Sequence, residues 1–332
     1  MSVPAPPSVA FVVIGRNEGD RLEECLRSVL SASPRVVYAD SGSTDGSAKR
    51  ARALGVHVIE LTPSKPLNAS RGRSEGFAAV QDRFPEAAFV QFLDGDCVLQ
   101  PGWVEVALDF IEVRPTVAVV CGRRFEKNPA ASFYNRMADE EWNTPIGRAD
   151  ACGGDSLMRI AALNEVGGFN PGLMASEEPE LCSRFRANGW DIWRLDAPMT
   201  EHDAAIFRFG QWWRRTVRSG YGYAQAWACS GRLPSRVNQP LLRRAFLWAI
   251  ILPALAGAAL VISGRAEFLA ALALAYAVQI ARIRAARRDR SLYAWKASAM
   301  LVLAKFPEAI GALKYFLGRR SHNIADYKSV AR

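Results

Sequence analysis

The sequence predicts an α/β domain followed by an apolar helical region, and three observations lead to this expectation. Before residue 230, short apolar segments rich in β-branched residues alternate with amphipathic segments. Polar residues stand where several of these apolar segments end. Beyond residue 244 the chain becomes rich in Leu, Ala and Val, with arginines grouped at the borders of the apolar stretches.

The strands and helices follow from the hydrophobic pattern. Residues 9–14 (VAFVVI) predict a strand buried on both faces, which is typical of the middle of a parallel sheet. Further strands are expected at residues 36–39, 56–61, 89–93 and 117–121. Helices are expected at residues 21–30, 71–84 and 101–113, and after the capping residues at 43–46. Because the connections are short, this alternation predicts a parallel α/β sheet.

Polar side chains follow three of the predicted strands. They are Asn17 and Glu18, Asp40, and the pair Asp94 and Asp96. Ligands of parallel sheets bind at the carboxyl ends of the strands, so these groups predict one crevice. Two carboxylates at the end of a buried strand form a hard-oxygen site suited to Mg²⁺ or Mn²⁺ beside nucleotide phosphates. A plain surface turn is the alternative for this Asp-x-Asp segment.

The composition excludes several classes of protein. The chain has 332 residues and a net charge of +9, with 50% hydrophobic and 23% charged residues. These averages exclude a disordered or collagen-like chain. The six cysteines form no CxxC pair, so we expect free thiols, a reducing compartment and no structural zinc site. The start of the sequence has no basic region, and we expect no signal peptide.

The apolar C-terminal region predicts a membrane hairpin. Residues 245–264 carry no charge and are long enough to cross a bilayer, and residues 266–283 form a second span. Residues 292–317 carry charges and predict an interfacial amphipathic helix or a third span. The alternative is a set of core helices in a soluble domain. We therefore divide the chain into a domain at 1–230 and a helical region at 231–332.

The arginine clusters indicate the orientation of this hairpin. They lie at residues 243–244, 282–290 and 319–320, beside the apolar stretches. Positive charge flanks membrane spans on the cytoplasmic side, so both ends of the hairpin are expected in the cytoplasm. A nucleic-acid partner is the alternative explanation of the net charge, and the position of the arginines argues against it.

Several segments together identify a family. VAFVVIGRNEGDRLEECLRSVL, VVYADSGSTDGS, NASRGRSEGF, VQFLDGDCVLQPGW and SEEPELCSRFRANGW occur in this order. Over about residues 8–230 the chain resembles the family 2 glycosyltransferases, which are inverting enzymes of the GT-A fold. The resemblance implies a nucleotide-sugar-binding mixed sheet flanked by helices. The C-terminal region resembles that of bacterial members at the inner membrane, with the catalytic domain in the cytoplasm.

The resemblance implies a donor, a metal and an acceptor. We expect a nucleoside-diphosphate sugar, first of all a UDP-sugar, with Mg²⁺ or Mn²⁺, and a hydroxyl of a glycan or glycolipid as acceptor. The residues placed at the nucleotide sugar are Asn17, Glu18, Asp40, Arg71, Arg73, Asp94, Gly153 and Gly154. Asp96 is expected to bind the metal directly, assisted by Asp94 and by His202 after the last core strand. A purely structural role is the alternative for this histidine.

The segment EEPEL supplies the expected catalytic base. Glu178 takes the position of the family's basic carboxylate, and Glu177 beside it is expected near the acceptor or the diphosphate. Glu177 and Glu180 are alternative candidates for the base. A structural role is a further alternative for these residues, because acidic side chains in the first turn of a helix interact favourably with its dipole.

The segment at residues 212–215 contains Trp212, Trp213, Arg214 and Arg215. These side chains are expected at the acceptor or the diphosphate leaving group. A helix at the membrane surface with tryptophan anchors is the alternative.

Two further functions remain open at this point. A polyprenyl-phosphate glycosyltransferase would transfer sugar to a phosphate, which needs no base, so EEPEL argues against it. A non-catalytic nucleotide-sugar-binding membrane protein would not need both DGD and EEPEL. A Rossmann dehydrogenase is excluded, because GRNEG follows the first strand where GxGxxG is required.

Overall fold

The computed structural model describes residues 9–230 and 236–318, which form two compact units. The first unit runs to Phe207 and includes residue 230 and residues 236–237, and the second holds residues 208–229 and 238–318. Helix α8 (Phe209–Cys229) therefore groups with the C-terminal helices, and the sequence-based division at residue 230 stays a prediction. Residues 319–320, part of the arginine pattern, lie outside the described residues.

The first unit is built on one 9-stranded mixed sheet with the order β3-β2-β1-β4-β8-β6-β9-β5, and β7 pairs with β9. The strands are β1 (Val9–Gly15), β2 (Val36–Asp40), β3 (His57–Glu60), β4 (Phe89–Asp94), β5 (Cys97–Leu99), β6 (Val117–Glu126), β7 (Gly147–Arg148), β8 (Ser156–Arg159) and β9 (Asp191–His202). The parallel order of β1 to β4 is confirmed. The other half is not purely parallel, because β8 runs antiparallel to β4 and β6.

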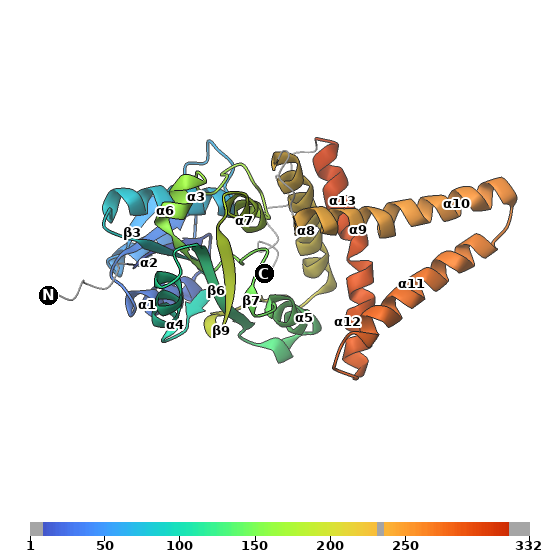
Figure 1. Ribbon diagram of the computed structural model, residues 1–332, viewed down its shortest axis with the longest axis horizontal. Helices are drawn as coiled ribbons and strands as arrows, with labels where there is room; N and C mark the ends of the chain where they lie inside the picture. The colour runs from blue at the N-terminus through green and yellow to red at the C-terminus, as the bar shows by residue number, and fades with distance from the viewer. Residues whose placement is uncertain (1–8, 231–235, 319–332) are drawn as a thin grey trace. The chain divides into compact units, whose positions relative to one another are not determined.

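Helices cover both faces of this sheet (Figure 1). They are α1 (Asp20–Leu30), α2 (Ser47–Ala53), α3 (Ala69–Arg83), α4 (Trp103–Glu112), α5 (Phe133–Trp142), α6 (Ile160–Glu165) and α7 (Glu177–Ala187), with a 3₁₀ turn at Pro129–Ala131. In the figure, α3, α6 and α7 lie on one face and α1 and α4 on the other. The apolar residues of β1, β2 and β4 are almost completely buried between these layers, as their continuous apolar runs predict.

The strand order places a crevice where polar residues gather. The chain passes from β1 to β2 on one side and returns to β4 on the other, so the order reverses at β1. Ligands of such sheets bind at the carboxyl ends beside the reversal. There Gly15 of β1 is paired with Asp40, and Ile14 is paired with Asp94. The carboxylates predicted from three strand ends therefore stand at one edge of the sheet.

Helix α3 lies unusually close to the sheet because of two glycines. A Cβ at Gly76 would lie 2.5 Å from Val12 Cγ1, and one at Gly72 would lie 3.2 Å from Ile14 Cγ2. At Gly76 a side chain would fit only if Val12 shifted, and at Gly72 the contact would be tight. This approach brings Arg73, which lies between the two glycines, under the end of β4.

The second unit consists of helices only. After α8 come α9 (Asn238–Phe246), a π-helical turn (Leu247–Ile251), α10 (Leu252–Ser263), α11 (Glu267–Ala285), α12 (Leu292–Leu303) and α13 (Lys305–Phe316). The expected single stretch at 292–317 is two helices of 12 residues each. Pro307 explains the break, because proline lacks an N–H and clashes with the preceding turn of a continuing helix. Neither helix alone reaches the roughly 20 residues of a membrane span.

Helices α8 and α13 pack with their backbones in near contact. A Cβ at Gly220 would overlap the carbonyl oxygen of Glu308, and a Cβ at Gly311 would overlap that of Val217. Small residues permit such close crossings.

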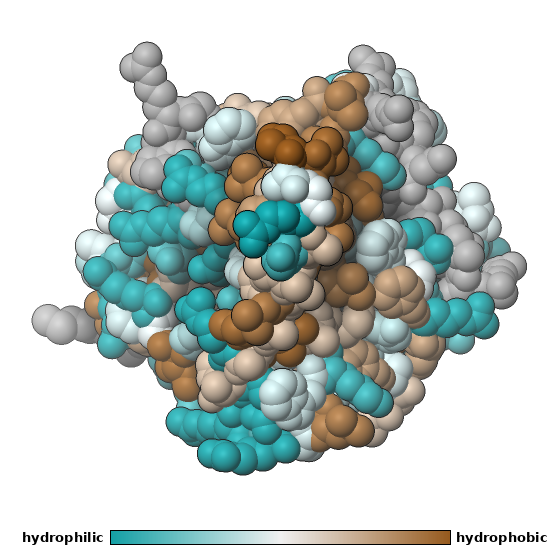
Figure 2. Space-filling view, turned by 90° about the vertical axis from the view of Figure 1, so that its right-hand side faces the viewer, coloured by the Kyte–Doolittle hydropathy of each residue, from teal (hydrophilic) through white to brown (hydrophobic). Residues whose placement is uncertain are grey.

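Helices α9 to α11 form the expected apolar hairpin (Figure 1). Two continuous helical segments have the length and composition of membrane spans, Asn238–Ser263 with a mean hydropathy of 2.4 and Glu267–Ala285 with 1.5. Only 6% and 0% of their apolar windows are buried, unlike the core helices of a soluble domain. Figure 2 looks toward the end of this hairpin and shows hydrophobic surface gathered in the middle of the view.

We expect Gly76→Val to destabilise the first unit by about 1–3 kcal/mol, because the added side chain overpacks the contact with Val12. Thermal unfolding of the full chain, followed by tryptophan fluorescence, measures this as a lower Tm. Gly210→Val is the control, since Gly210 is exposed and an added Cβ there meets only the end of the Arg214 side chain at 3.7 Å. Equal Tm values for the two variants would contradict the close packing of α3.

Candidate active site

Arg73 is the centre of the charged cluster at the end of β4. Its side chain is 2% exposed, and the guanidinium donates to Asp94 Oδ1 at 2.8 Å and to Glu177 Oε1 at 2.6 Å. Glu178 Oε1 lies 3.4 Å from Arg73 Nη2. Burial acts to lower the pKa of Arg73, but Glu178, Asp94 and Glu177 outweigh it and raise that pKa. One buried cation therefore holds α3, β4 and the start of α7 together.

A second arginine, Arg124 of β6, contacts the other side of Asp94. Its Nη2 lies 3.2 Å from Asp94 Oδ2, and its Nε lies 3.6 Å from Asp155 Oδ2. Asp155 is completely buried and accepts from the Asp94 backbone N–H at 3.0 Å and from the Thr200 hydroxyl at 2.7 Å. Burial acts to raise the pKa of Asp94, but Arg73 and Arg124 outweigh it and lower that pKa. Asp94 is thus held ionised by two cations.

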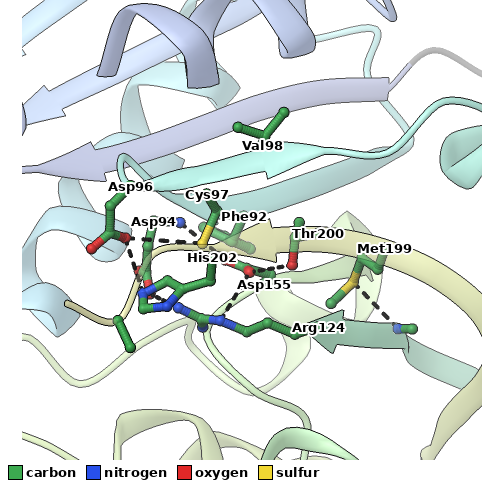
Figure 3. A network of polar contacts seen from close by, with 12 residues as sticks. Phe92, Asp94, Asp96, Cys97, Val98, Arg124, Asp155, Met199, Thr200 and His202 are labelled. Atoms are coloured by element: carbon green, nitrogen blue, oxygen red, sulfur yellow. Dashed lines mark hydrogen bonds and ion pairs between the residues drawn. The ribbon is translucent and has the colours of Figure 1, made fainter. Parts of the chain in front are cut away.

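Asp96 and His202 form the group best suited to a metal (Figure 3). His202 Nε2 lies 3.3 Å from Asp96 Oδ1, and both side chains are buried. His202 Nδ1 is a buried nitrogen without a hydrogen-bond partner among the described residues. The ring of Trp142 packs edge-on against His202 at 4.7 Å. A carboxylate beside an imidazole is a donor set that Mn²⁺ accepts, so the residues fit the expected divalent cation.

Glu178 lies in the first turn of α7 with 15% of its side chain exposed. Burial and the neighbouring Glu177 raise the pKa of Glu178 to about 7, although Arg73 opposes this. Glu177 is bonded to Arg73, and Glu180 is bonded to Arg184 at 2.8 and 2.7 Å. Of the three acidic residues in EEPEL, Glu178 thus has the environment of a general base working near neutral pH.

The two glycines predicted at the donor sugar have different surroundings. A Cβ at Gly154 would overlap Arg73 Nη2 and would lie 3.2 Å from both Asp94 Oδ2 and Glu178 Oε1. A Cβ at Gly153 would meet nothing within 4 Å. Gly154 is therefore required by the charged cluster itself, whereas Gly153 borders open space.

The residues predicted at the nucleotide line the loops after β1 and β2. Asn17 has a φ of 56°, and its side chain accepts from the Thr44 backbone N–H at 2.7 Å. Glu18 pairs with Arg21 at 2.8 Å. Asp40 accepts from the hydroxyl of Tyr38 at 2.8 Å, and from the backbone N–H groups of residues 42 and 43 at 3.1 and 2.8 Å. These contacts fix the shape of both loops.

Arg71 is directed away from the charged cluster. It donates to the carbonyl oxygens of Thr62 and Lys65 at 2.8 and 3.0 Å and to Glu75 at 2.5 Å. Its guanidinium therefore holds the loop between β3 and α3. The predicted contact of Arg71 with the base or diphosphate stays a prediction.

The remaining predicted site residues, Trp212, Trp213, Arg214 and Arg215, lie on α8 in the second unit. Trp212 is buried, and its ring lies 5.6 Å from that of Phe209. Their expected role at the acceptor or the diphosphate stays a prediction.

Sequence reasoning missed three residues of the site, namely Arg124, Asp155 and Trp142. Arg124 and Trp142 lie in a stretch without clear periodicity. Asp155 follows Gly153 and Gly154 and directly precedes β8, and this position between two glycines and a strand was the available signal. The Arg124 guanidinium also lies over the Trp142 ring at 5.0 Å, so these residues support each other beside His202.

Comparison with known proteins shows which family the chain matches. The model of the family "Glycosyl transferase family 2" matches residues 10–166. The chain is 23% identical over 260 residues to the glycosyltransferase AglE of Haloferax volcanii, covering 74% of this chain and 81% of AglE. It is 26% identical over 206 residues to the succinoglycan biosynthesis protein ExoA of Rhizobium meliloti, covering 57% of this chain and 61% of ExoA.

A solved structure has the same fold. The mannosyltransferase PcManGT of Pyrobaculum calidifontis, in complex with GDP-Man and Mn²⁺, superposes with a TM-score of 0.62. The superposition covers 95% of this chain and 89% of that protein at 17% identity. The predicted GT-A architecture is thereby confirmed.

We expect Gly154→Ala to lower the Tm by a few degrees, because the new methyl group displaces a guanidinium held by several carboxylates. Gly153→Ala, one residue away, is the matched control and should leave the Tm unchanged or slightly raised. Thermal unfolding of both variants checks this. A similar Tm for the two would show that the cluster is looser than the structure describes.

The pKa of Glu178 also predicts a pH-dependent stability. Because this pKa is raised from 4.5 to about 7, the folded state keeps a proton that the unfolded state releases. The resulting stabilisation is complete below pH 4.5 and is lost as the pH rises through about 7. Glu178→Gln should therefore raise the Tm more at pH 8 than at pH 5. Glu180→Gln, which breaks an ion pair with Arg184, should show no such gain. A Tm gain for Glu178→Gln that is equal at both pH values would refute the raised pKa.

Proposed function

Because this chain belongs to glycosyl transferase family 2, we propose that it is an inverting glycosyltransferase acting on a hydroxyl acceptor, with Glu178 as the base. As a family member it is an enzyme of the EC 2.4 class that uses a nucleotide-sugar donor. The observation that carries the proposal is the position of Glu178, partly buried beside Gly154 with its pKa raised to about 7.

The reaction is one displacement at the anomeric carbon. Glu178 takes the proton of the acceptor hydroxyl as the oxygen forms its bond to that carbon. The bond from the anomeric carbon to the diphosphate breaks in the same step, and one inversion results. A pKa near 7 leaves much of Glu178 ionised at neutral pH while keeping it basic enough to accept the proton.

Arg73 positions this base. Its bonds to Asp94 and Glu177 fix the start of α7 against β4, and its charge limits the rise in the pKa of Glu178. Asp96 and His202 are the residues that would hold a divalent cation, with Asp94 close by. When bound, this cation supplies positive charge to the departing diphosphate.

The proposal extends to the nucleotide of the donor sugar. Asn17, Glu18 and Asp40 line the loops proposed to bind it. A UDP-sugar is our first candidate from the family resemblance, and a GDP-sugar is the second, since the structurally similar PcManGT was solved with GDP-Man. Binding measured with UDP-sugars and GDP-sugars, each with and without Mn²⁺, separates these two donors.

We place the enzyme at the cytoplasmic face of the inner membrane. The support is the pair of apolar helical segments, whose apolar windows are only 6% and 0% buried, and the arginines that follow the second segment. This location suits a glycolipid or a lipid-linked glycan as acceptor. A polyprenyl phosphate is the second candidate. It is less favoured because a phosphate acceptor has no hydroxyl proton for the base Glu178 to remove.

We expect Glu178→Gln to lower kcat by about 100- to 10,000-fold, since the amide cannot accept the proton. Binding of the nucleotide sugar should be unchanged, because the side chain keeps its size. Asp96→Ala should abolish transfer together with metal-dependent donor binding. Turnover of a donor sugar to a glycan acceptor, alongside calorimetric donor binding, measures both effects.

Glu180→Gln controls for the loss of a carboxylate from the same helical turn and should leave turnover near that of the wild type. Near wild-type turnover in Glu178→Gln would remove Glu178 as the base. Transfer to a polyprenyl phosphate that survives Glu178→Gln would favour the second acceptor class.

A further inference from the structure

We infer that Cys97 is a third protein ligand of the divalent cation, through its sulfur, beside Asp96 and His202. The inference rests on the proposed function, because it assumes a cation at the Asp-x-Asp segment. It adds a donor atom that no motif in the sequence indicates. It also gives the site a mixed oxygen, sulfur and nitrogen donor set, which bears on the choice of metal.

The sheet register places Cys97 directly opposite His202. Strands β5 and β9 pair antiparallel, and these two residues are partners in the ladder. Directly opposed residues project their side chains on the same face, with Cβ atoms about 4.5–5.5 Å apart. Asp96 precedes Cys97 in the chain, and its Oδ1 lies 3.9 Å from the Cys97 sulfur. The backbone thus places the side chains of Asp96, Cys97 and His202 close together.

The donor atoms are close enough to share one ion. An oxygen of Asp96, the sulfur of Cys97 and a nitrogen of His202 all lie within 4.8 Å of one another, and the three residues are buried. In Figure 3 the sulfur of Cys97 points toward the Asp96 carboxylate and the His202 ring. A cysteine that served only to fill space in the core would not need its sulfur to point toward these polar groups.

The two other carboxylates near the Cys97 sulfur are already paired with a cation of the protein. Asp94 and Asp155 also lie with Cys97 in a group whose donor atoms are within 4.8 Å. The guanidinium of Arg124 contacts both of these carboxylates, at 3.2 and 3.6 Å. A fixed cation therefore occupies the side of Asp94 and Asp155, and a metal is best accommodated on the side of Asp96 and His202. Cys97 borders that side.

Sulfur ligation changes the choice of metal. On binding, the metal replaces the thiol proton, which passes to solvent. A thiolate is a softer donor than a carboxylate or water, so the site should prefer Mn²⁺, Co²⁺ or Zn²⁺ over Mg²⁺. Cys97→Ser replaces the sulfur by a weaker hydroxyl donor of similar size. It should weaken Mn²⁺ binding by about tenfold or more and Mg²⁺ binding much less.

Absorption spectroscopy of the purified full chain loaded with Co²⁺ tests the assignment without an activity assay. Wild-type protein should show a sulfur-to-cobalt charge-transfer band in the near ultraviolet, together with the visible bands of bound Co²⁺. Cys97→Ser should lose the first and keep the second. Cys121→Ser is the matched control, because Cys121 is a buried cysteine of β6 in neither group of donor atoms, and it should keep both bands.

Bound Co²⁺ without a charge-transfer band in the wild type would overturn the inference and leave the proposed function intact. A band that survives in Cys97→Ser would overturn it as well. If the wild type binds neither Co²⁺ nor Mn²⁺, the metal-dependent part of the proposed function fails together with the inference.

Discussion

The candidate site depends on the buried guanidinium of Arg73. It neutralises carboxylates from β4 and from the first turn of α7, which would otherwise repel one another away from water. Removing one partner of a buried charge network typically costs several kcal/mol, because the remaining charges stay buried and uncompensated. The same cation therefore determines the stability of this region and the position of Glu178.

This constraint explains the glycines around the cluster. Gly76 allows α3 to lie against β1, which carries Arg73 to the end of β4. Gly154 leaves the space that the guanidinium occupies. Arg73 is committed to its carboxylates, so the role that we propose for it is to position Glu178 as the base. Arg124 pairs in a similar way with the other carboxylate oxygen of Asp94.

Much of the first unit could be predicted from the sequence, because β1, β2 and β4 are continuous apolar runs and α1 and α3 have helical spacing. The convergence of Asp94, Asp96, Glu178 and His202 was implied by the family resemblance. Arg124 and Cys97 could not be identified, because their positions arise from pairing among β5, β6 and β9, strands distant in the chain. No local pattern encodes such pairing.

The central claim is that the protein environment turns Glu178 into a base working near neutral pH. A ¹³C NMR titration of the glutamate carboxyl carbons tests this most directly, with the Glu178 signal assigned by its loss in Glu178→Gln. We predict that this signal titrates with a midpoint of about 7. A midpoint near the ordinary value of 4.5 would contradict the account.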